Sequence, residues 1–530
     1  MMELTISKSW LKALTGLIKS TVTTESILFA SVLAIAIFGW SDSMVDRHIS
    51  PKQLYTAWVT SVAVIVLGVK YLATRNLSMD FTAICLIIIT LCTGEAIYAI
   101  GQRFNLFTPN FYYTVTGHFD NPAGLMSCLC AGIPFTLYLY DKGKICKIMS
   151  STCASIIFTA LILSESRTGI ICASALLAYM IMGKAGFPIK KRTAIAFAAI
   201  VLMATIGYYL KKDSADGRIL IWQCALDMIR DTPLTGFGGD AFQRLYMNYQ
   251  ADWLTRHQDS PMAMLADNAA SPFNEYIHLY ICYGIAGITT LAILTALLIR
   301  AYRKRPSREK VTAVLALACI GFTCMFSYPL RYPSTWIVFA VCVYTLFCDL
   351  KIVGKRHFNN VICLACITIS IVSTIRLHDR IKSEWRWNEA SKFKHTEAYE
   401  RLMPKFADNP YFLYNYAVIL YEKGFTDKSL DTAIRCDKYI ANYDLELLLG
   451  DIYFDKGDYE MSENHYLRAS HMCPCRFVPL NQLYDLYIKT DRNAEAISVA
   501  RHAADMPLKI KSRTAIQIRY KMKKALGLIK

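Results

Sequence analysis

A short segment from Ser271 to His278 carries side chains that could perform acid–base chemistry. Its proline suits the first turn of a helix, and Asn274 and His278, four residues apart, would then share one face. Asn274 could hold a substrate oxygen, and either Glu275 or His278 could accept a proton. A helix N-terminus makes a carboxylate a weaker base, whereas imidazole titrates near neutral pH, so the chemistry slightly favours His278. A purely packing role for His278 stays open.

Two arginines have positions that suit phosphate binding. Arg167 lies in Ser-Glu-Ser-Arg-Thr-Gly, at the turn between two apolar segments, and Arg218 opens a segment with apolar residues at helical spacing. A guanidinium group offers a planar fork for the phosphates of a lipid-linked substrate, and both arginines could reach the same phosphate. Arg167 could instead simply pair with Glu165.

One further acidic residue and one glycine-rich turn stand out. Glu95 lies late in an apolar segment, where an ionisable group is costly and needs a reason. It could be the partner of an arginine or a site residue. Residues 233–238 read Pro-Leu-Thr-Gly-Phe-Gly, which predicts a tight turn but no Walker-type phosphate loop.

The elements that must position these residues are membrane helices. Of the residues, 54% are hydrophobic and the mean hydropathy is +0.29, values typical of a membrane protein. We predict about eleven spans, although the first and the sixth are short for a bilayer that needs ~20 residues. They lie at 26–40, 54–74, 79–100, 122–140, 147–164, 168–183, 193–210, 275–299, 310–328, 333–350 and 358–376.

The basic residues predict the orientation. Alternate loops hold most of them, and the positive-inside rule places those loops and the N-terminus in the cytoplasm. The loop 211–274 and the C-terminal part then face outward. The net charge of +17 is largely explained in this way, so it gives no reason to expect nucleic-acid binding. The basic residues of the first set of loops are Lys8, Lys12 and Lys19, then Lys70 and Arg75, and those within 142–147, 184–192, 300–310 and 351–356. The other short loops hold only Arg47, Lys52, Arg103, Arg167 and Arg331.

The composition becomes soluble and helix-rich after Arg376. Similar motifs recur with a period near 34 residues, as at Tyr416 and Gly450, which predicts stacked helix pairs that resemble tetratricopeptide repeats. We expect two to three repeats between about 395 and 510, and a role in binding a partner protein. An unrelated helical bundle stays an alternative. The predicted domains are 1–376 and 377–530.

The eighteen cysteines do not indicate a disulfide framework. Fifteen fall in or beside apolar stretches, where a thiol behaves as a small hydrophobic group. The other three are Cys436, Cys473 and Cys475, and a bond from the first to one of the others is possible if this part is exported.

The ordered set of motifs resembles the O-antigen ligase and polymerase superfamily of membrane glycosyltransferases. The motifs that carry the resemblance are Gly-His-Phe-Asp-Asn-Pro-Ala-Gly at 117–124, Ser-Arg-Thr-Gly at 166–169, Gly-Arg at 217–218 with Trp222, the turn at 233–238, and Phe-Asn-Glu-Tyr at 273–276 leading to Tyr283-Gly284.

This resemblance implies an activity and a set of roles. The activity is transfer of a glycan from an undecaprenyl diphosphate carrier, outside the inner membrane, without metal or nucleotide cofactor. The acceptor would be lipid A core, another glycan or a protein hydroxyl. By position, Arg167 and Arg218 match the arginines that bind the diphosphate, and Asn121 and Asn274 lie in the substrate-binding motifs. Fixed guanidinium groups would stabilise the charge that develops on the departing diphosphate.

Two positions depart from the ligase pattern. Many ligases carry histidine before the asparagine of the last motif, where this chain has Phe273, and Cys282 stands where an acidic residue often precedes the Tyr-Gly pair. Either Glu275 or His278 supplies the base, or the acceptor chemistry differs, or the activity is lost. The fold that the sequence predicts is all-α, a polytopic membrane bundle followed by helical repeats. The alternative is a non-enzymatic transporter or assembly scaffold for envelope polysaccharide.

Overall fold

The computed structural model describes residues 22–110, 112–257, 259–348, 356–509 and 511–529. Within these ranges the chain consists of helices joined by turns, without strands, which confirms the all-α prediction. The basic residues expected to fix the orientation at Lys8, Lys12, Lys19, Lys351 and Lys355 lie outside the described residues.

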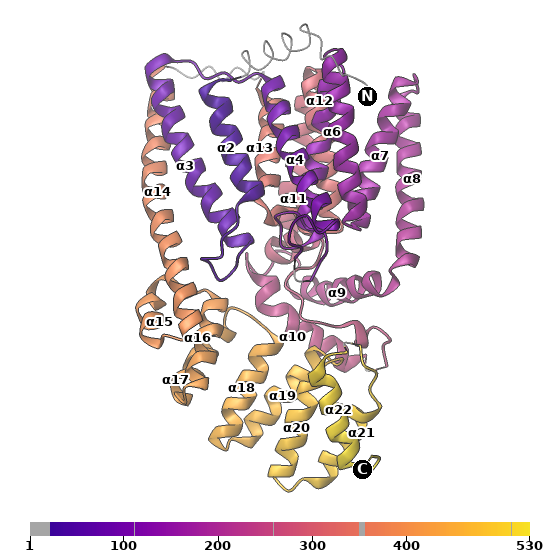
Figure 1. Cartoon of the computed structure of the whole chain (residues 1–530), viewed down its shortest axis with the longest axis vertical. Helices are drawn as coiled ribbons and strands as arrows, with labels where there is room; N and C mark the ends of the chain where they lie inside the picture. The colour runs from indigo at the N-terminus through magenta and orange to yellow at the C-terminus, as the bar shows by residue number, and fades with distance from the viewer. Residues whose placement is uncertain (1–21, 111, 258, 349–355, 510, 530) are drawn as a thin grey trace. The chain divides into compact units, whose positions relative to one another are not determined.

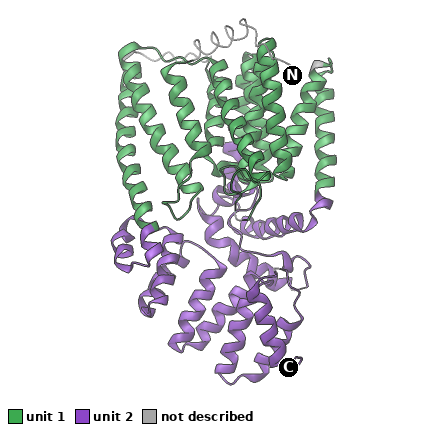
Figure 2. Cartoon of the chain, in the orientation of Figure 1, with its two compact units in different colours: residues 1–207, 292–388 green, residues 208–291, 389–530 purple. Residues whose placement is uncertain are grey.

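The chain forms two compact units (Figure 2). The first unit consists of Met1–Gly207 and Ala292–Asn388, and the second of Tyr208–Leu291 and Glu389–Lys530. The long loop and residues 275–291 of the helix that follows it thus belong with the C-terminal region. The domain limits 1–376 and 377–530 stay a prediction.

Every predicted apolar stretch forms a helix, and in the first unit these helices run side by side (Figure 1). Among the described residues, seven helices are long and apolar enough to cross a membrane by length and composition: α3, α4, α5, α6, α8, α11 and α14. Three more apolar helices, α2, α7 and α13, are shorter, so the count of eleven spans stays a prediction. The bounds are α2 Thr24–Phe38, α3 Ile49–Thr74, α4 Phe81–Arg103, α5 Pro122–Tyr140, α6 Lys144–Leu163, α7 Arg167–Lys184, α8 Ile189–Leu210, α11 Glu275–Lys304, α12 Arg308–Cys324, α13 Pro333–Phe347 and α14 Arg356–Phe393.

Helix α5 is the centre of the first unit. It contacts α4, α6, α7 and α12, and most of its side chains are buried. Asn121 begins the helix by accepting hydrogen bonds from the backbone N–H groups of Ala123 (2.8 Å) and Gly124 (3.1 Å), and Pro122 occupies the first helical position. An asparagine cap followed by proline satisfies a helix N-terminus, so this motif fixes where α5 starts.

The second unit contains the loop helices and a row of helix pairs. The loop helices are α9 Lys212–Asp231 and α10 Ala241–Arg256. The later helices are α15 Thr396–Leu402, α16 Pro410–Glu422, α17 Thr426–Asp437, α18 Tyr443–Lys456, α19 Tyr459–Met472, α20 Val478–Lys489, α21 Asn493–Asp505 and α22 Arg513–Ala525. Single 3-10 turns lie at Ala263–Leu265, Pro329–Arg331 and Met403–Lys405.

The helix pairs α16/α17, α18/α19 and α20/α21 are the predicted repeats. The Ser429 hydroxyl donates to the carbonyl of Ala417 (2.8 Å), and one repeat later Ser462 donates to Gly450 (2.9 Å). Position 450 requires a glycine, because a Cβ there would lie 2.4 Å from the ring of Tyr466. Equivalent bonds at equivalent positions confirm a helical-repeat domain, in which each pair covers the apolar face of the next.

The loop helices and the repeats share one hydrophobic core. Phe242 and Tyr246 of α10 are buried in the same cluster as Tyr443 and Met472 of the repeats. The buried side chain of Gln250 donates to the carbonyls of Met472 (2.7 Å) and Asp267 (3.1 Å). The loop helices and the repeat domain are therefore packed together into one unit.

All eighteen cysteines lie among the described residues, and none forms a disulfide. Cys436, Cys473 and Cys475 are buried, and their thiols pack inside the second unit. The Cys475 thiol donates to the carbonyl of Ala266 (3.2 Å), so it serves as a contact between repeats and loop. The disulfide that the sequence left open is absent from the structure.

Candidate functional site

Helix α11 begins after Asn274, three residues later than the start at Pro272 that the sequence suggested. The helix starts at Glu275, and the Asn274 side-chain oxygen accepts hydrogen bonds from the backbone N–H groups of Tyr276 (2.9 Å) and Ile277 (3.0 Å). Asn274 therefore caps the helix, and Pro272 lies before it, outside the first turn. A substrate oxygen would have to meet the amide nitrogen of Asn274, because the amide oxygen holds the cap.

Glu275 and His278 face each other across the first turn of α11. The Glu275 Oε2 and His278 Nδ1 atoms are 3.6 Å apart. The carboxylate is largely buried, with 13% of its side chain exposed, whereas 41% of the imidazole is exposed. At this distance the two side chains form an ion pair when the imidazole is protonated.

Arg218 lies next to this turn. Its guanidinium carbon is 5.3 Å from the ring centre of Phe273, in a cation–π contact. The Trp222 ring N–H, one turn further along α9, donates to the carbonyl of Pro272 (2.8 Å). These two contacts bind α9 to the residues directly before Asn274, and so hold Arg218 beside the segment that leads into α11.

Two local expectations for this region need correction. Helix α9 begins at Lys212, so Arg218 lies in its second turn and does not open the helix. Phe273, which stands where ligases often carry histidine, has φ +52°, in the left-handed region that few side chains adopt. Its backbone N–H donates to the Ser271 hydroxyl (3.2 Å). Phe273 therefore supports Arg218 at the point where another base was expected.

The glycine-rich turn at 233–238 fits into a break in α11. Gly284 has φ +57° and interrupts the helix, and a Cβ there would lie 2.3 Å from the carbonyl oxygen of Leu234. The backbone N–H groups of Phe237 and Gly238 donate to the carbonyls of Ile281 and Cys282, both at 2.9 Å, which the break deprives of helical partners. The turn thus fixes the direction of the helix segment that carries Glu275 and His278.

Arg167 belongs to the first unit. It is the first residue of α7, whose N-terminus is capped by the Ser166 hydroxyl. Its Nη1 donates to the carbonyl of Gly207 at the end of α8 (2.6 Å). This bond holds α7 and α8 together and directs the guanidinium group. That Arg167 and Arg218 hold one phosphate stays a prediction.

Asn121 also belongs to the first unit, and its bonds are intramolecular. Besides capping α5, its amide nitrogen donates to an oxygen of Asp120 (2.8 Å) and to the Tyr328 hydroxyl (2.9 Å). The Tyr332 hydroxyl in turn donates to Asp120 (2.8 Å). These contacts join the start of α5 to the chain before α13, and binding of substrate by Asn121 stays a prediction.

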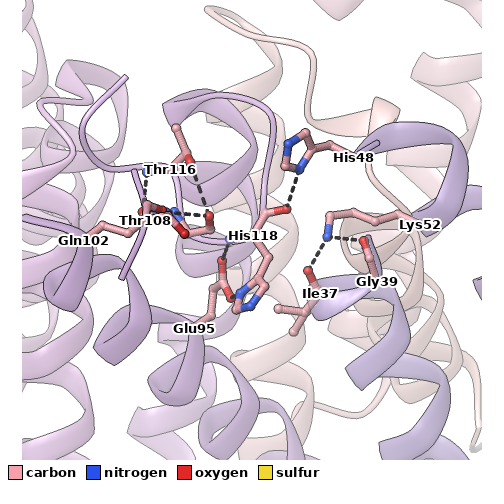
Figure 3. A network of polar contacts seen from close by, with 10 residues as sticks. Ile37, Gly39, His48, Lys52, Glu95, Gln102, Thr108, Thr116 and His118 are labelled. Atoms are coloured by element: carbon pink, nitrogen blue, oxygen red, sulfur yellow. Dashed lines mark hydrogen bonds and ion pairs between the residues drawn. The ribbon is translucent and has the colours of Figure 1, made fainter. Parts of the chain in front are cut away.

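The partner of Glu95 is a histidine that the sequence did not single out. Glu95 is fully buried; one of its oxygens accepts the backbone N–H of His118 (2.7 Å), and the other lies 2.8 Å from His118 Nδ1 (Figure 3). Gly117 has φ +62°, and a Cβ there would overlap this carboxylate. Because a buried carboxylate needs a partner, the sequence indicated that Glu95 would be paired, but it did not indicate with which residue.

Lys52 is the second buried charge of Figure 3. Its ammonium group, 1% exposed, donates to the carbonyls of Ile37 and Gly39 (2.8 Å to Gly39) at the end of α2. A lysine at the end of a helix satisfies carbonyls that have no helical partner. Among the described residues, no group of three or more His, Cys, Asp or Glu side chains could hold a metal ion.

The glycine break, the turn packed into it and Arg218 all fall within one stretch of the chain. Residues 152–292 match the family model of the O-antigen ligase. This match confirms the resemblance expected from the motifs between Ser166 and Gly284. The O-antigen ligase match supports a membrane glycan ligase or transferase role for this part of the chain.

Other comparisons add no argument. No curated protein matches the sequence. Among solved structures, the crystal structure of yeast Tom70 is similar at 10% identity, covering 88% of this chain and 96% of that one, with a TM-score of 0.25. A similarity of this degree supports no conclusion about fold or function.

Proposed function

We propose that this protein transfers a glycan from an undecaprenyl diphosphate carrier to an acceptor hydroxyl at the outer face of a bacterial inner membrane. The observation that supports the proposal is the contact of Arg218 with Phe273, two residues before Glu275 of the Glu275–His278 pair. A guanidinium group and the two candidate bases thus belong to neighbouring residues at the start of α11, within the stretch that matches the O-antigen ligase family.

The transfer needs a base and a stabilised leaving group. His278 accepts the proton of the acceptor hydroxyl while the oxygen of that hydroxyl attacks the anomeric carbon of the donor glycan. The bond from that carbon to the phosphate oxygen breaks, and its electron pair leaves on the undecaprenyl diphosphate. Glu275 orients the imidazole and stabilises its protonated form, and Arg218 stabilises the charge that grows on the diphosphate.

Arg167 and the two asparagines complete the proposal. Arg167, directed by Gly207, provides a second guanidinium for the diphosphate, and Asn274 donates from its amide nitrogen to a sugar oxygen. Asn121 fixes the start of α5 and contributes to the donor side.

The acceptor is lipid A core, another glycan or a protein hydroxyl. Because the repeats share a core with the loop helices, an acceptor or a partner protein bound by the repeats would be held by the same unit that carries His278.

We also propose that the C-terminal domain lies in the periplasm and the N-terminus in the cytoplasm, as the distribution of basic residues in the short loops predicts. A reporter at the C-terminus that is active in the cytoplasm would contradict this orientation.

The test compares variants in a deletion strain scored for lipopolysaccharide ladders, capsule and glycoproteins together. We expect Arg218→Ala, His278→Ala and Arg167→Ala to abolish one of these products at unchanged protein level. Arg218→Lys should retain partial activity, because it keeps the charge but loses the planar fork. The matched control is Arg230→Ala, an exposed arginine of the same helix that pairs with Asp227.

Each outcome has a defined meaning. Loss of a single product identifies the acceptor class. Full activity of both Arg218→Ala and Arg167→Ala would overturn the mechanism and would favour a transporter or assembly scaffold. Activity of His278→Ala with loss in Glu275→Gln would assign the base to Glu275.

A further inference from the structure

The loop between α4 and α5 exposes an unusual number of large apolar side chains. Within residues 104–115, Leu106 is 75% exposed and Tyr112 is 81% exposed, and Phe104, Phe107 and Tyr113 are exposed as well. The chain has no Lys, Arg, Asp or Glu between Arg103 and Asp120. Exposed apolar groups without charges between them mark a surface that meets something other than water.

Hydrogen bonds of a buried side chain hold the base of this loop together. Gln102, 3% exposed, forms them with both the nitrogen and the oxygen of its side-chain amide (Figure 3). The nitrogen donates to the carbonyls of Thr108 and Gly117, both at 3.2 Å, and the oxygen accepts the N–H groups of Thr116 (3.0 Å) and Gly117 (2.8 Å). Asn110 also donates to the carbonyl of Asp120 (3.1 Å). The exposed side chains therefore project from a pinned loop.

The loop continues the outer stripe of a membrane helix. Ile97 of α4 is 53% exposed, and Phe104 lies two turns later on the same side. Phe107, further along the loop, folds back over Gly101, where a Cβ would lie 2.5 Å from its ring, and stacks on Tyr98 with ring centres 4.5 Å apart. Exposed apolar side chains are thus found both on the last turns of α4 and in the loop that follows.

The position of the loop along the chain fits the edge of a bilayer. Helix α4 has 23 residues and is long and apolar enough to cross a membrane. At ~1.5 Å per residue it covers about 34 Å, close to the thickness of the hydrocarbon core. The loop begins at the next residue, where the hydrocarbon ends and the polar head groups start.

We propose that residues 104–110 and 112–115 insert their exposed aromatic and leucine side chains into the interfacial layer of the lipid bilayer. Tyrosine and phenylalanine gather at this layer because it accepts both an apolar ring and a polar edge. The insertion sets the depth of the Gly117–Asn121 segment, since Gln102 and Asn110 connect the loop to that segment. The occupant of this surface is lipid, not glycan or protein.

The test places the photo-crosslinking residue p-benzoylphenylalanine at Tyr112 of the full chain in native membranes. We expect the irradiated protein to carry phospholipid adducts by mass spectrometry, as it would with the same residue at Ile97. The matched control is Phe425, an aromatic residue of the repeats that is 50% exposed. It should give few lipid adducts or none.

Two outcomes would overturn the proposal. One is crosslinking at Tyr112 mainly to protein or glycan; the other is equal lipid labelling at Phe425.

A second measurement uses the double variant Leu106→Asp with Tyr112→Asp, in the full chain in native membranes. These exposed positions tolerate charge in the fold, so crosslinking to lipid from a probe at Tyr113 should fall severalfold at unchanged protein level, whereas Leu106→Phe with Tyr112→Trp should preserve it. Unchanged crosslinking in the aspartate variant would contradict insertion.

Discussion

Arg218 and Phe273 show how one residue changes the meaning of another. The phenylalanine stands where a histidine was expected, and read alone it suggests a missing base. In the structure its ring lies against the guanidinium of Arg218, and it directly precedes the asparagine that caps α11. The residue therefore positions a cation, and Glu275 and His278, the proposed acid–base groups, follow in the first turn of α11.

The Glu95–His118 pair gives a prediction at this scale. Glu95→Ala leaves the His118 backbone N–H and imidazole without their buried partner, and should cost about 1–3 kcal/mol of unfolding free energy. Glu95→Gln retains an acceptor for the backbone N–H and should cost less. Thermal unfolding of the detergent-solubilised protein measures both. Equal stability of the wild type and the alanine variant would show that the pair is dispensable.

The cysteines of the repeat domain give a second prediction. Burial raises the pKa of the Cys436 thiol to about 12, and burial also raises the pKa values of Cys473 and Cys475. Since the thiolate is the reactive form, iodoacetamide at about pH 8 should modify these thiols only after denaturation. Mobility on gels should not depend on reductant. A disulfide among the three in the exported protein would contradict the structure.

At the scale of the element, the break in α11 matters most. The helix changes direction at Gly284, and the turn at 233–238 supplies donors for the carbonyls that the break exposes. A continuous helix would carry Glu275 and His278 in a different direction. The glycines of this turn thus act on the site through backbone geometry, since they carry no side chain of their own.

Gly284→Ala tests this device. Its φ of +57° and the close carbonyl of Leu234 leave no room for a methyl group, so the variant should lose at least about 2 kcal/mol of stability and most of its transfer activity. The matched control is Gly217→Ala in α9, where a Cβ meets nothing within 4 Å. Alanine there should stabilise the protein by about 0.5–1 kcal/mol. The two melting temperatures, measured side by side, decide between backbone strain and a general intolerance of change.

At the scale of the whole molecule, the long loop and the repeats form one unit. Residues of α9 and α10 share a core with α18 and α19, and Asp267 pairs with Arg476 at 2.7 Å. A recruiting domain on a flexible tether would move independently of the site. Here, a partner bound to the repeats would instead have a fixed relation to His278.

The buried amide of Gln250 tests the unity of the second unit. Gln250→Ala removes donors from the carbonyls of Met472 and Asp267, and should cost about 2 kcal/mol or more. Hydrogen exchange should then increase together in α10 and α19. The matched control is Gln243→Ala, whose bond to the Tyr411 hydroxyl is exposed. Increased exchange in α10 alone would show that the loop and the repeats unfold separately.

The sequence by itself determined the elements and the choice of residues. Apolar stretches that lack charges can only form buried or lipid-facing helices, so all eleven were located from periodicity and length. The repeat period followed from the spacing of recurring tyrosine and glycine positions, such as Tyr453 to Tyr487 and Gly424 to Gly457, because stacked helix pairs repeat their packing and turn positions at a fixed interval. The O-antigen ligase resemblance followed from motif order, and the family match confirms it for 152–292.

Only the tertiary structure decided which residues meet. The contact of Arg218 with Phe273, the pairing of Glu95 with His118 and the helix break at Gly284 all join segments that are distant in sequence or depend on one left-handed backbone angle. The shared core of loop and repeats is of the same kind, since it unites residues more than two hundred positions apart. Local patterns fix local hydrogen bonds, whereas packing between segments is chosen by the fold as a whole.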